Sequence, residues 1–520
     1  MHARDVTPAP DDTTAWPRGI VGACGIVGTI GVTLVVASSV LNGPHGPTGS
    51  SIERDVMRLA PTGHAAAFFG GLTMGVGIAL LLGAWLTLGL FLRRGAPLRP
   101  LFRCAIAWSV PMLIGPPLFS RDVYSYAAQG LMVRDHIDPY HHGPAALGSS
   151  HFLAPVSPIW MHTASPYGPL FLRLAAIAVH VAGGSIVAAA LVLRSYEVLG
   201  VVLIAVSLPK LASAVGKDPA RAVWLGVLNP LVLFHFIGGA HNDALMVGLL
   251  VAGLAAASND RPLLGVLLCT LGATIKAPAA IAVVFIAVTA VRALPAGRRL
   301  RASLEYAGVS AGIFAGITAI TGMSWGWISA LSVPGTNRSL LTPTTFVAHW
   351  LSEPFGHYES ILSLTRGLGQ LCGLIGIAYL LWRAPRIGMA RACGLALALL
   401  VAFGPIVLPW YALWGIVVLG AVGRRIERGF AIFASIILLC MIEPSGSSMP
   451  DSVLMGAVVV LSVVALAIAW RPVRRWIRKD LAATIDRYRR GEIVHLGTAM
   501  RSALPELTFL RSDAMEPPAA

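Results

Sequence analysis

The chain has 520 residues, of which 56% are hydrophobic and only 12% are charged, and its mean hydropathy is +0.74. This composition excludes an ordinary soluble globular protein and indicates a polytopic protein of the lipid bilayer. The formal net charge of +15 does not indicate nucleic-acid binding, because no nucleic-acid-binding motif accompanies it and the basic residues lie in short clusters between apolar runs. We therefore predict membrane lipids as partners and no nucleic acid.

Apolar segments long enough to cross a bilayer recur from residue 20 almost to residue 470. A transmembrane helix needs about 20 apolar residues, and the alternating pattern of transmembrane strands is absent. The first run, residues 20–41, is longer than a signal-peptide core and follows a leader that is not basic, so we interpret it as a retained span. The sequence predicts an all-α polytopic membrane protein with about 14 transmembrane helices.

The basic clusters orient the chain, because Lys and Arg concentrate in cytoplasmic connections. They lie around residues 93–103, 210–221, 292–301, 383–391, 424–428 and 471–479. Two long connections poor in Lys and Arg, residues 120–168 and 321–359, are predicted to be extracytoplasmic loops. We expect a multi-pass plasma-membrane protein with both termini in the cytoplasm: a leader at residues 1–19, a transmembrane domain at residues 20–470, and a basic amphipathic tail at residues 471–520.

Parity decides how the first outer loop ends. Residues 169–181 and 185–208 are both apolar enough to be spans, but if both crossed the membrane, the cluster at Lys210 would lie outside. We therefore predict that residues 169–181 form a membrane-dipping helix that belongs to the outer loop.

Polar and aromatic side chains gather at predicted outer ends of spans that are distant in sequence. Burying a carboxylate at the boundary of the hydrocarbon layer is costly, so we expect Asp122 to have either an ion-pair partner or a functional role. The neighbouring Arg121 is one such partner, in a purely structural ion pair, but the coincidence of several polar outer ends favours a site. The candidate site residues are Arg121, Asp122, Tyr124, Tyr167, His241, Asn242, Asp243, Lys276, Arg338, Trp410 and Tyr411.

Several of these residues also have a structural interpretation. Trp and Tyr at membrane ends commonly form an aromatic belt, and Lys276 is placed to extend its ammonium to the interface. Asn242 and Asp243 at a helix start are good N-cap residues, and for them capping and function have equal weight. The histidines of the first outer loop match no standard zinc spacing, and no nucleotide-binding loop is present, so we predict no metal and no cofactor.

Taken in order along the chain, the motifs resemble the membrane-embedded glycosyltransferases of the C-type fold. More narrowly, they resemble the actinobacterial polyprenol-phosphomannose-dependent α-1,6-mannosyltransferases that build the mannan core of lipomannan and lipoarabinomannan. The motifs that carry the resemblance are Ser120-Arg121-Asp122 after a span, Asp138-Pro139-Tyr140, Ser165-Pro166-Tyr167-Gly168-Pro169, Asn229-Pro230, Gly239-Ala240-His241-Asn242-Asp243 and Pro409-Trp410-Tyr411.

The resemblance implies transfer of mannose, with inversion, from a polyprenyl-phosphomannose donor to a lipid-anchored mannan acceptor on the outer face of the membrane. Asp122 occupies the position of the family's acidic residue in the first outer loop, and it suits a general base. The predicted cations that stabilise the negative charge of the departing phosphate are Lys276, Arg338 and Arg121. The predicted sugar and acceptor pocket comprises His241, Asn242, Asp243, Tyr124, Tyr167, Trp410 and Tyr411.

Three alternatives stay open at this point. A secondary transporter places its site near the bilayer midplane, and Arg194 with Glu197 lies deep enough for that role, although an intrahelical ion pair three residues apart is the plainer interpretation. A flippase for lipid-linked sugars is the second alternative. The third is a C-type transferase of another sugar, such as arabinose, because only the resemblance selects mannose.

Overall fold

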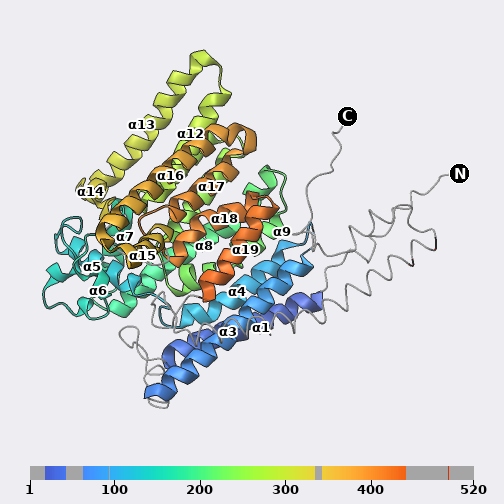
Figure 1. The fold of residues 1–520 in the computed structure, drawn as a ribbon, viewed down its shortest axis with the longest axis vertical. Coiled ribbons are helices and arrows are strands. Elements are labelled where there is room, and N and C mark those ends of the chain that lie inside the picture. The colour runs from blue at the N-terminus through green and yellow to red at the C-terminus, as the bar shows by residue number, and fades with distance from the viewer. Residues whose placement is uncertain are drawn as a thin grey trace.

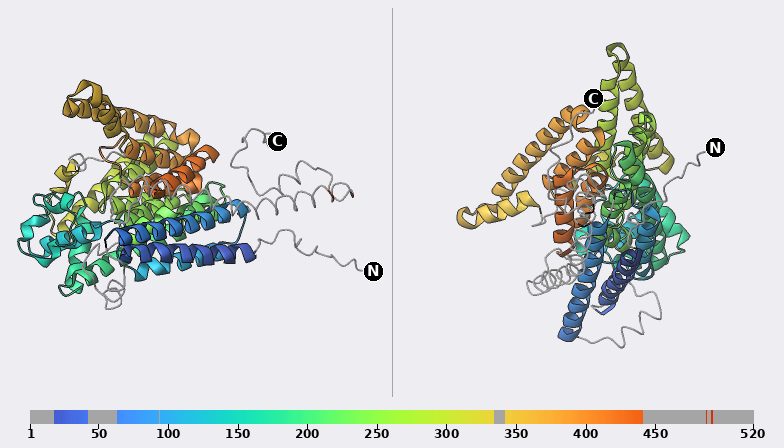
Figure 2. Two further views of the ribbon diagram at one scale, coloured as in Figure 1. Left: turned by 60° about the horizontal axis from the view of Figure 1, so that its bottom comes forward. Right: turned by 90° about the vertical axis from the view of Figure 1, so that its right-hand side faces the viewer.

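The computed structural model describes residues 18–41, 63–92, 94–333 and 342–440, together with Asp486 and Arg490. Within these ranges the protein consists of helices and connecting turns, with no strand. Figure 1 shows the helices packed side by side along one direction, and Figure 2 shows α5 and α6 at one end of the bundle. The prediction of an all-helical fold is confirmed for the described residues.

The helices run in the following order: α1 (Arg18–Leu41), α3 (Gly63–Phe91), α4 (Leu98–Ile114), α5 (Asp122–Arg134), η2 (Pro144–Leu147), η3 (His151–Leu153), α6 (Pro158–Met161), α7 (Pro169–Val181), α8 (Ile186–Ala214), α9 (Pro219–Gly226), η4 (Val232–Gly238), α10 (Asp243–Ala257), α11 (Pro262–Ala273), η5 (Ala277–Ala279), α12 (Ala280–Ala293), α13 (Ala296–Thr321), α14 (Trp327–Ala330), α15 (Pro343–Phe355), α16 (Tyr358–Ile387), α17 (Met389–Ala402), η7 (Pro409–Tyr411), α18 (Ala412–Val422) and α19 (Arg425–Cys440).

Five of the described helices are long and apolar enough to cross a membrane, namely α1, α3, α8, α13 and α16. A sixth candidate is the pair η4 and α10, which bends by 116° at its break. Further apolar helices are shorter, among them α7, α11, α17 and the run from η7 through α18. The predicted number of about 14 spans is not established by these helices and stays a prediction.

Small residues let the long helices approach one another closely. A Cβ atom added to Gly31 of α1 would lie 2.6 Å from the carbonyl oxygen of Gly77 in α3, and one added to Gly248 of α10 would lie 2.6 Å from that of Gly200 in α8. Any larger side chain would force these pairs apart. This is the packing expected of helices in lipid, where close backbone contact replaces the hydrophobic effect.

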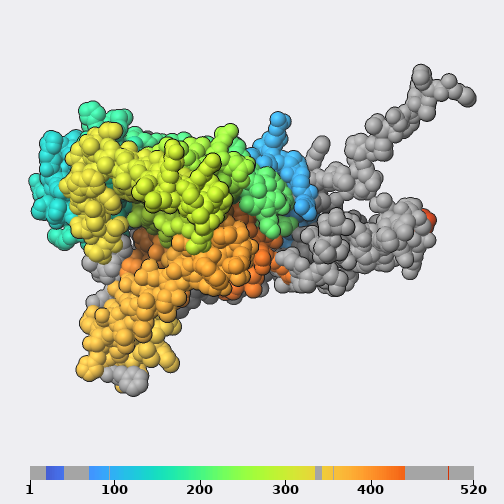
Figure 3. Space-filling view, turned by 90° about the horizontal axis from the view of Figure 1, so that it is seen from above, coloured from blue at the N-terminus to red at the C-terminus, as the bar shows by residue number. Residues whose placement is uncertain are grey.

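Large apolar side chains cover much of the outer surface of α16. Leu364, Leu368, Leu371, Leu374 and Ile375 are each more than half exposed. Figure 3 shows the segment containing α15 and α16 standing out from the body of the molecule, apart from the α12–α13 hairpin. Such surface suits hydrocarbon as its solvent.

The first predicted outer loop contains a helix, and the helix that precedes the loop ends before it begins. Helix α4 ends at Ile114, six residues before Ser120, because Gly115-Pro116-Pro117 follows and prolines cannot continue the backbone hydrogen bonds. Residues 120–168 then contain α5, which is buried along most of its length against α7 and α8. Its polar residues are buried in protein rather than exposed to water, so hydropathy alone did not reveal the helix.

Residues 169–181 form a helix with the predicted bounds, α7. The second predicted outer loop, residues 321–359, contains α14 and α15. Arg338 lies outside the described residues.

Candidate active site

Asp122 begins α5 and is only 6% exposed. Its Oδ1 accepts a hydrogen bond of 2.8 Å from the indole N–H of Trp160. Its Oδ2 lies 3.4 Å from Nδ1 of His241, which is longer than an ordinary hydrogen bond. The structure records no ion pair between Asp122 and Arg121, both of which it describes, so the structural ion pair considered from the sequence is not supported.

The surroundings of Asp122 favour its ionised form. Burial by itself would raise the pKa of this carboxyl, but contact with His241, the Trp160 hydrogen bond and the charge of Lys276 together hold the pKa below its ordinary value. The side chain is therefore an anion at neutral pH. An ionised, nearly buried carboxylate can accept a proton.

His241, Asn242 and Asp243 lie at the sharp bend between η4 and α10, and all three are fully buried. η4 is a π-helix, a rare form that often occurs at functional sites. Ala240 next to it has φ of 50°, a left-handed conformation that is strained for a residue with a side chain. The backbone is thus held in an unfavourable conformation immediately before His241.

Asp243 pairs with Lys276 across the site. Lys276 Nζ donates to Asp243 Oδ2 at 2.7 Å, and the indole N–H of Trp414 donates to Oδ1 at 2.6 Å. Lys276 therefore has a buried carboxylate partner. The two residues are 33 positions apart in sequence, and the bend at α10 brings them together.

Aromatic rings surround the Lys276 ammonium. Its Nζ lies 4.6 Å from the ring centre of Tyr411 and 5.6 Å from those of Tyr167 and Trp414. Lys276 is 7% exposed, so its ammonium lies within the protein rather than at the membrane surface. The snorkelling interpretation is not supported, and the arrangement is one in which ring faces stabilise a cation.

The N-terminus of α10 is capped from another helix. Asn242 is its N-cap residue but makes no side-chain cap bond, and Asp243 faces Lys276 and Trp414 instead. Glu197 of α8 accepts the N–H of Leu245 at 3.1 Å. The capping interpretation of Asn242 and Asp243 is therefore wrong, since Glu197 has that role.

Gly168 brings the first outer segment to the Lys276 turn. Its N–H donates to the carbonyl of Ile275 at 2.9 Å, and Leu170 N–H donates to that of Thr274 at 3.1 Å. A Cβ atom at residue 168 would lie 2.1 Å from the Thr274 oxygen. Only glycine permits this approach, which places Tyr167 beside Lys276.

Trp410 stacks on His241 with ring centres 3.8 Å apart, and His235 lies 5.4 Å from Trp410 and 5.7 Å from His241. Within the described part of the chain, neither nitrogen of either histidine has a hydrogen-bond partner. The side-chain amide of Asn242 also has none there. Buried polar groups are normally paired, so this cluster has hydrogen-bonding capacity that the protein itself does not use.

Tyr126, rather than Tyr124, faces the cluster. Tyr124 is buried, but it lies two residues from Asp122 on α5 and so on the other side of the helix, near Arg194. Tyr126 is four residues from Asp122 and contacts the ring of Tyr167 at 5.2 Å. Burial, with the charges of Asp122 and Asp243, raises the pKa of both Tyr126 and Tyr167, so both carboxylates border one aromatic cluster.

Arg194 and Glu197 were expected to pair within α8, and this expectation is wrong. The Arg194 guanidinium donates to the carbonyls of Met112, Gly115 and Gly238 at 3.2, 2.8 and 3.3 Å, and so fastens the end of α4 to the bend before α10. Both side chains thus hydrogen-bond to backbone groups around the site.

The sequence predictions missed Tyr126, Trp160, Trp414 and Glu197 as parts of the site. The spacing of four residues from Asp122 is the signal for Tyr126, whereas the partners of Trp160 and Glu197 are set by tertiary structure alone. Arg121 is half-buried beside the cluster at the N-cap of α5. No group of three potential metal ligands occurs in the described ranges, and the absence of a metal or cofactor stays a prediction.

The sequence matches two family models that together cover most of the chain. The model described as "Alpha-(1->6)-mannopyranosyltransferase, N-terminal domain" matches residues 25–292, and that described as "MptB C-terminal domain" matches residues 339–471. The first match contains most of the site described above, and the second contains Trp410, Tyr411 and Trp414. These matches confirm the resemblance inferred from the motifs.

Curated relatives agree with these models. Alpha-(1->6)-mannopyranosyltransferase A of Mycobacterium tuberculosis is 34% identical over 463 residues, covering 84% of this chain and 86% of the relative. The proteins named alpha-(1->6)-mannopyranosyltransferase A and B of Corynebacterium glutamicum are 32% and 31% identical, covering 76% and 71% of this chain and 86% and 67% of their own lengths. The chain therefore belongs to the α-(1→6)-mannopyranosyltransferase family.

Proposed function

We propose that the protein transfers mannose from polyprenyl-phosphomannose to a lipid-anchored mannan or phosphatidylinositol-mannoside acceptor, forming an α-1,6 linkage with inversion. Family membership and the names of the relatives support mannose transfer. The observation that carries the chemistry is the ionised Asp122, fixed by Trp160 and His241 beside the Lys276–Asp243 pair.

In this reaction the acceptor hydroxyl oxygen bonds to the anomeric carbon of mannose while the bond from that carbon to the phosphate oxygen breaks. The proton of the hydroxyl passes to Asp122, and the electron pair of the broken bond leaves with the polyprenyl phosphate. General-base assistance of this kind contributes about 10²- to 10⁴-fold. The donor is already activated and membrane-bound, so a nucleotide site is not needed.

The leaving phosphate requires positive charge. We assign this role to Lys276, with Arg121 and Arg338 as further cations. Asp243 and the aromatic rings hold the Lys276 ammonium in place, so little reorganisation is needed as charge develops on the phosphate.

The unused hydrogen-bonding groups of His241 and Asn242 suit the hydroxyls of a sugar, and Trp410 and Tyr411 offer apolar ring faces. We assign the sugar and acceptor pocket to these four residues with Asp243 and Tyr167. Tyr126 takes the place there that the sequence had suggested for Tyr124.

We also propose the C-type fold with about 14 spans, an extracytoplasmic active site and cytoplasmic termini. The exposed apolar surface of α16 supports a bilayer position, and the basic clusters support the orientation. The transporter alternative rested on Arg194 and Glu197, and both side chains hydrogen-bond to backbone groups instead. A transferase of another sugar such as arabinose, or a flippase, is separated from this proposal by the following assay.

Membranes containing the protein are incubated with radiolabelled polyprenyl-phosphomannose and a short α-1,6-mannoside. We expect labelled product that an α-1,6-specific mannosidase degrades. A parallel incubation with labelled polyprenyl-phosphoarabinose serves as the control for sugar choice. Transfer of arabinose alone, or movement of the lipid across the bilayer without any glycoside product, would contradict the proposal.

A further inference from the structure

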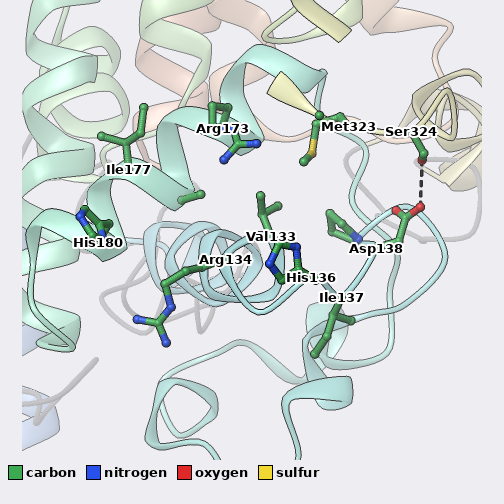
Figure 4. Close-up of a pocket in the computed structure, with 13 residues that line it drawn as sticks. Val133, Arg134, His136, Ile137, Asp138, Arg173, Ile177, His180, Met323 and Ser324 are labelled. Carbon is green, nitrogen blue, oxygen red and sulfur yellow. Dashed lines mark hydrogen bonds between the residues drawn. The ribbon is translucent and has the colours of Figure 1, made fainter. Parts of the chain in front are cut away.

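A cavity of about 500 Å³ lies at the far end of α5 from Asp122. Its walls come from the end of α5, one side of α7 and the turn after α13 (Figure 4). Asp122 and Arg134 are at opposite ends of α5, about 18 Å apart at 1.5 Å per residue. A ligand in this cavity is therefore separate from the reacting groups.

Side chains that can carry positive charge surround this cavity. Arg173 and His180 lie on one face of α7, together with Ile177, at helical spacing. Arg134 and His136 come from the end of α5, and Figure 4 shows these four basic side chains around the same opening.

The conformation of His136 is unusual for its residue type. Its N–H bonds to the carbonyl of Val133 at 3.3 Å and that of Ile137 bonds to Met132 at 2.8 Å, which is the hydrogen-bond pattern that closes helices with a left-handed residue. That residue is usually glycine, yet His136 adopts φ of 58°. The unfavourable backbone conformation thus occurs at a residue whose side chain lines the cavity.

The carboxylate that lines this cavity, Asp138, is already hydrogen-bonded to other groups of the protein. Asp138 Oδ1 accepts the N–H of Tyr140, and Oδ2 accepts the Ser324 hydroxyl, both at 2.8 Å, while His141 Nδ1 lies 3.0 Å away. Figure 4 shows the Asp138–Ser324 pair on the side away from Arg134 and His180. The basic side of the cavity is thus free of this carboxylate.

Hydrogen bonds hold one of the basic side chains, Arg173, at the wall of the cavity. Arg173 donates from Nε to the carbonyl of Thr321 at 2.9 Å, and its Nη2 contacts the same oxygen, which holds the guanidinium at the cavity wall. Among the residues that the structure describes, Arg134 pairs with Asp135 alone, and exposed pairs of this kind are weak. Thr321 also ends α13, a helix long and apolar enough to cross a membrane.

We propose that this cavity binds a phosphate group of a molecule other than the mannose donor, carried by an anionic lipid headgroup or present as free phosphate. Guanidinium groups match the geometry of phosphate oxygens and bind them by charge-assisted hydrogen bonds. The inference does not depend on the proposed transfer reaction, because it concerns a different part of α5.

The test is calorimetric titration of the full-length protein, purified in a neutral detergent, with two probes: dihexanoyl-phosphatidylglycerol and inorganic phosphate. The variants are Arg134→Gln/His180→Asn and His180→Asn alone, since both residues are exposed. Arg298→Gln is the matched control, because Arg298 is an exposed basic residue at the other end of α13.

We expect the double variant to weaken phosphatidylglycerol binding at least about fivefold and His180→Asn to weaken it less, with the control within about twofold of the wild type. Competition by inorganic phosphate identifies the phosphate group alone as sufficient, whereas its absence identifies a lipid headgroup. A wild-type protein that binds neither probe, or a correctly folded double variant that binds both as tightly as the control, overturns the proposal.

Discussion

Asp122 and Asp243 are two buried carboxylates with different partners, and this difference suggests their roles. Asp243 is matched by the full charge of Lys276 at 2.7 Å. Asp122 accepts a hydrogen bond from the indole N–H of Trp160 and lies 3.4 Å from an imidazole nitrogen of His241. The Lys276 ammonium affects it by charge alone, without a direct contact. The two carboxylates therefore differ in the groups that contact them, although both are buried. We therefore expect Asp243 to position Lys276 and Asp122 to accept the proton.

The pH dependence of transfer follows from the same surroundings. The pKa of Asp122 is held below its ordinary value of about 3.9, so the base is ionised above that value and becomes protonated only as the pH falls through the lowered pKa. The stabilisation by its partners is likewise lost only in that acid range. We expect kcat/KM to stay constant from pH 8 to about 5. An acid limb centred near pH 6 would instead indicate a histidine as the base.

Replacing Lys276 with Met should have two separable effects. Removing one partner of a buried ion pair costs about 3–5 kcal/mol of folding free energy, so thermal stability falls, and donor affinity falls because the phosphate loses a cation. The double variant Lys276→Met/Asp243→Asn removes both charges and should recover much of the stability without recovering donor binding. Recovery of donor binding in the double variant would show that Lys276 serves only the stability of the site.

At the scale of structural elements, two features bring the site residues together: the bend before α10, and the backbone hydrogen bonds that join Gly168 and Leu170 to the turn before Lys276. Gly168→Ala places a methyl group 2.1 Å from the Thr274 oxygen, so Tyr167 must move away from Lys276. We expect a loss of about 1–3 kcal/mol in stability and a clear loss of transfer per folded molecule. Gly308→Ala is the control, because an added Cβ there meets nothing within 4 Å. Equal activity of the two variants would mean that Tyr167 has no part in transfer.

The cap that Glu197 supplies can be tested in the same way. Glu197→Ala leaves the N–H of Leu245 without its acceptor and should cost about 1–2 kcal/mol, with a fall in transfer because the His241 bend loosens. Glu197→Gln keeps an acceptor oxygen and should retain most of the stability and activity. If both variants behave like the wild type in thermal unfolding and transfer, Glu197 does not position the bend.

The sequence predicted the separate parts of this site better than the way they come together. Asp122, the His241-Asn242-Asp243 bend and Lys276 were recognised because charges are rare in apolar sequence and their cost demands an explanation. The Lys276–Asp243 pair, the Trp160 hydrogen bond and the Glu197 cap join segments 33 to 48 residues apart. Those contacts depend on helix packing, which local patterns do not determine. Helix α5 was missed for the same reason, since burial against α7 and α8 replaced the apolar pattern expected in lipid.

For the whole molecule, the proposed orientation makes a direct prediction. In a variant lacking native cysteines, we expect a cysteine at residue 149, on the first outer segment, to react with an impermeant maleimide added to intact cells. One at residue 297, at the start of α13 after the basic cluster of residues 292–301, should react only after lysis. Both positions are exposed. The reverse pattern would contradict the topology, and with it transfer on the outer face.

The measurement closest to the central claim is transfer by Asp122→Asn. The amide preserves the shape and the acceptor oxygen for Trp160, but it is too weak a base to take a proton at neutral pH. We expect transfer from polyprenyl-phosphomannose to fall at least about 100-fold, while thermal stability and donor affinity stay near those of the wild type. Near-normal transfer per folded molecule, with reduced stability, would contradict the account and move the general base to Asp243.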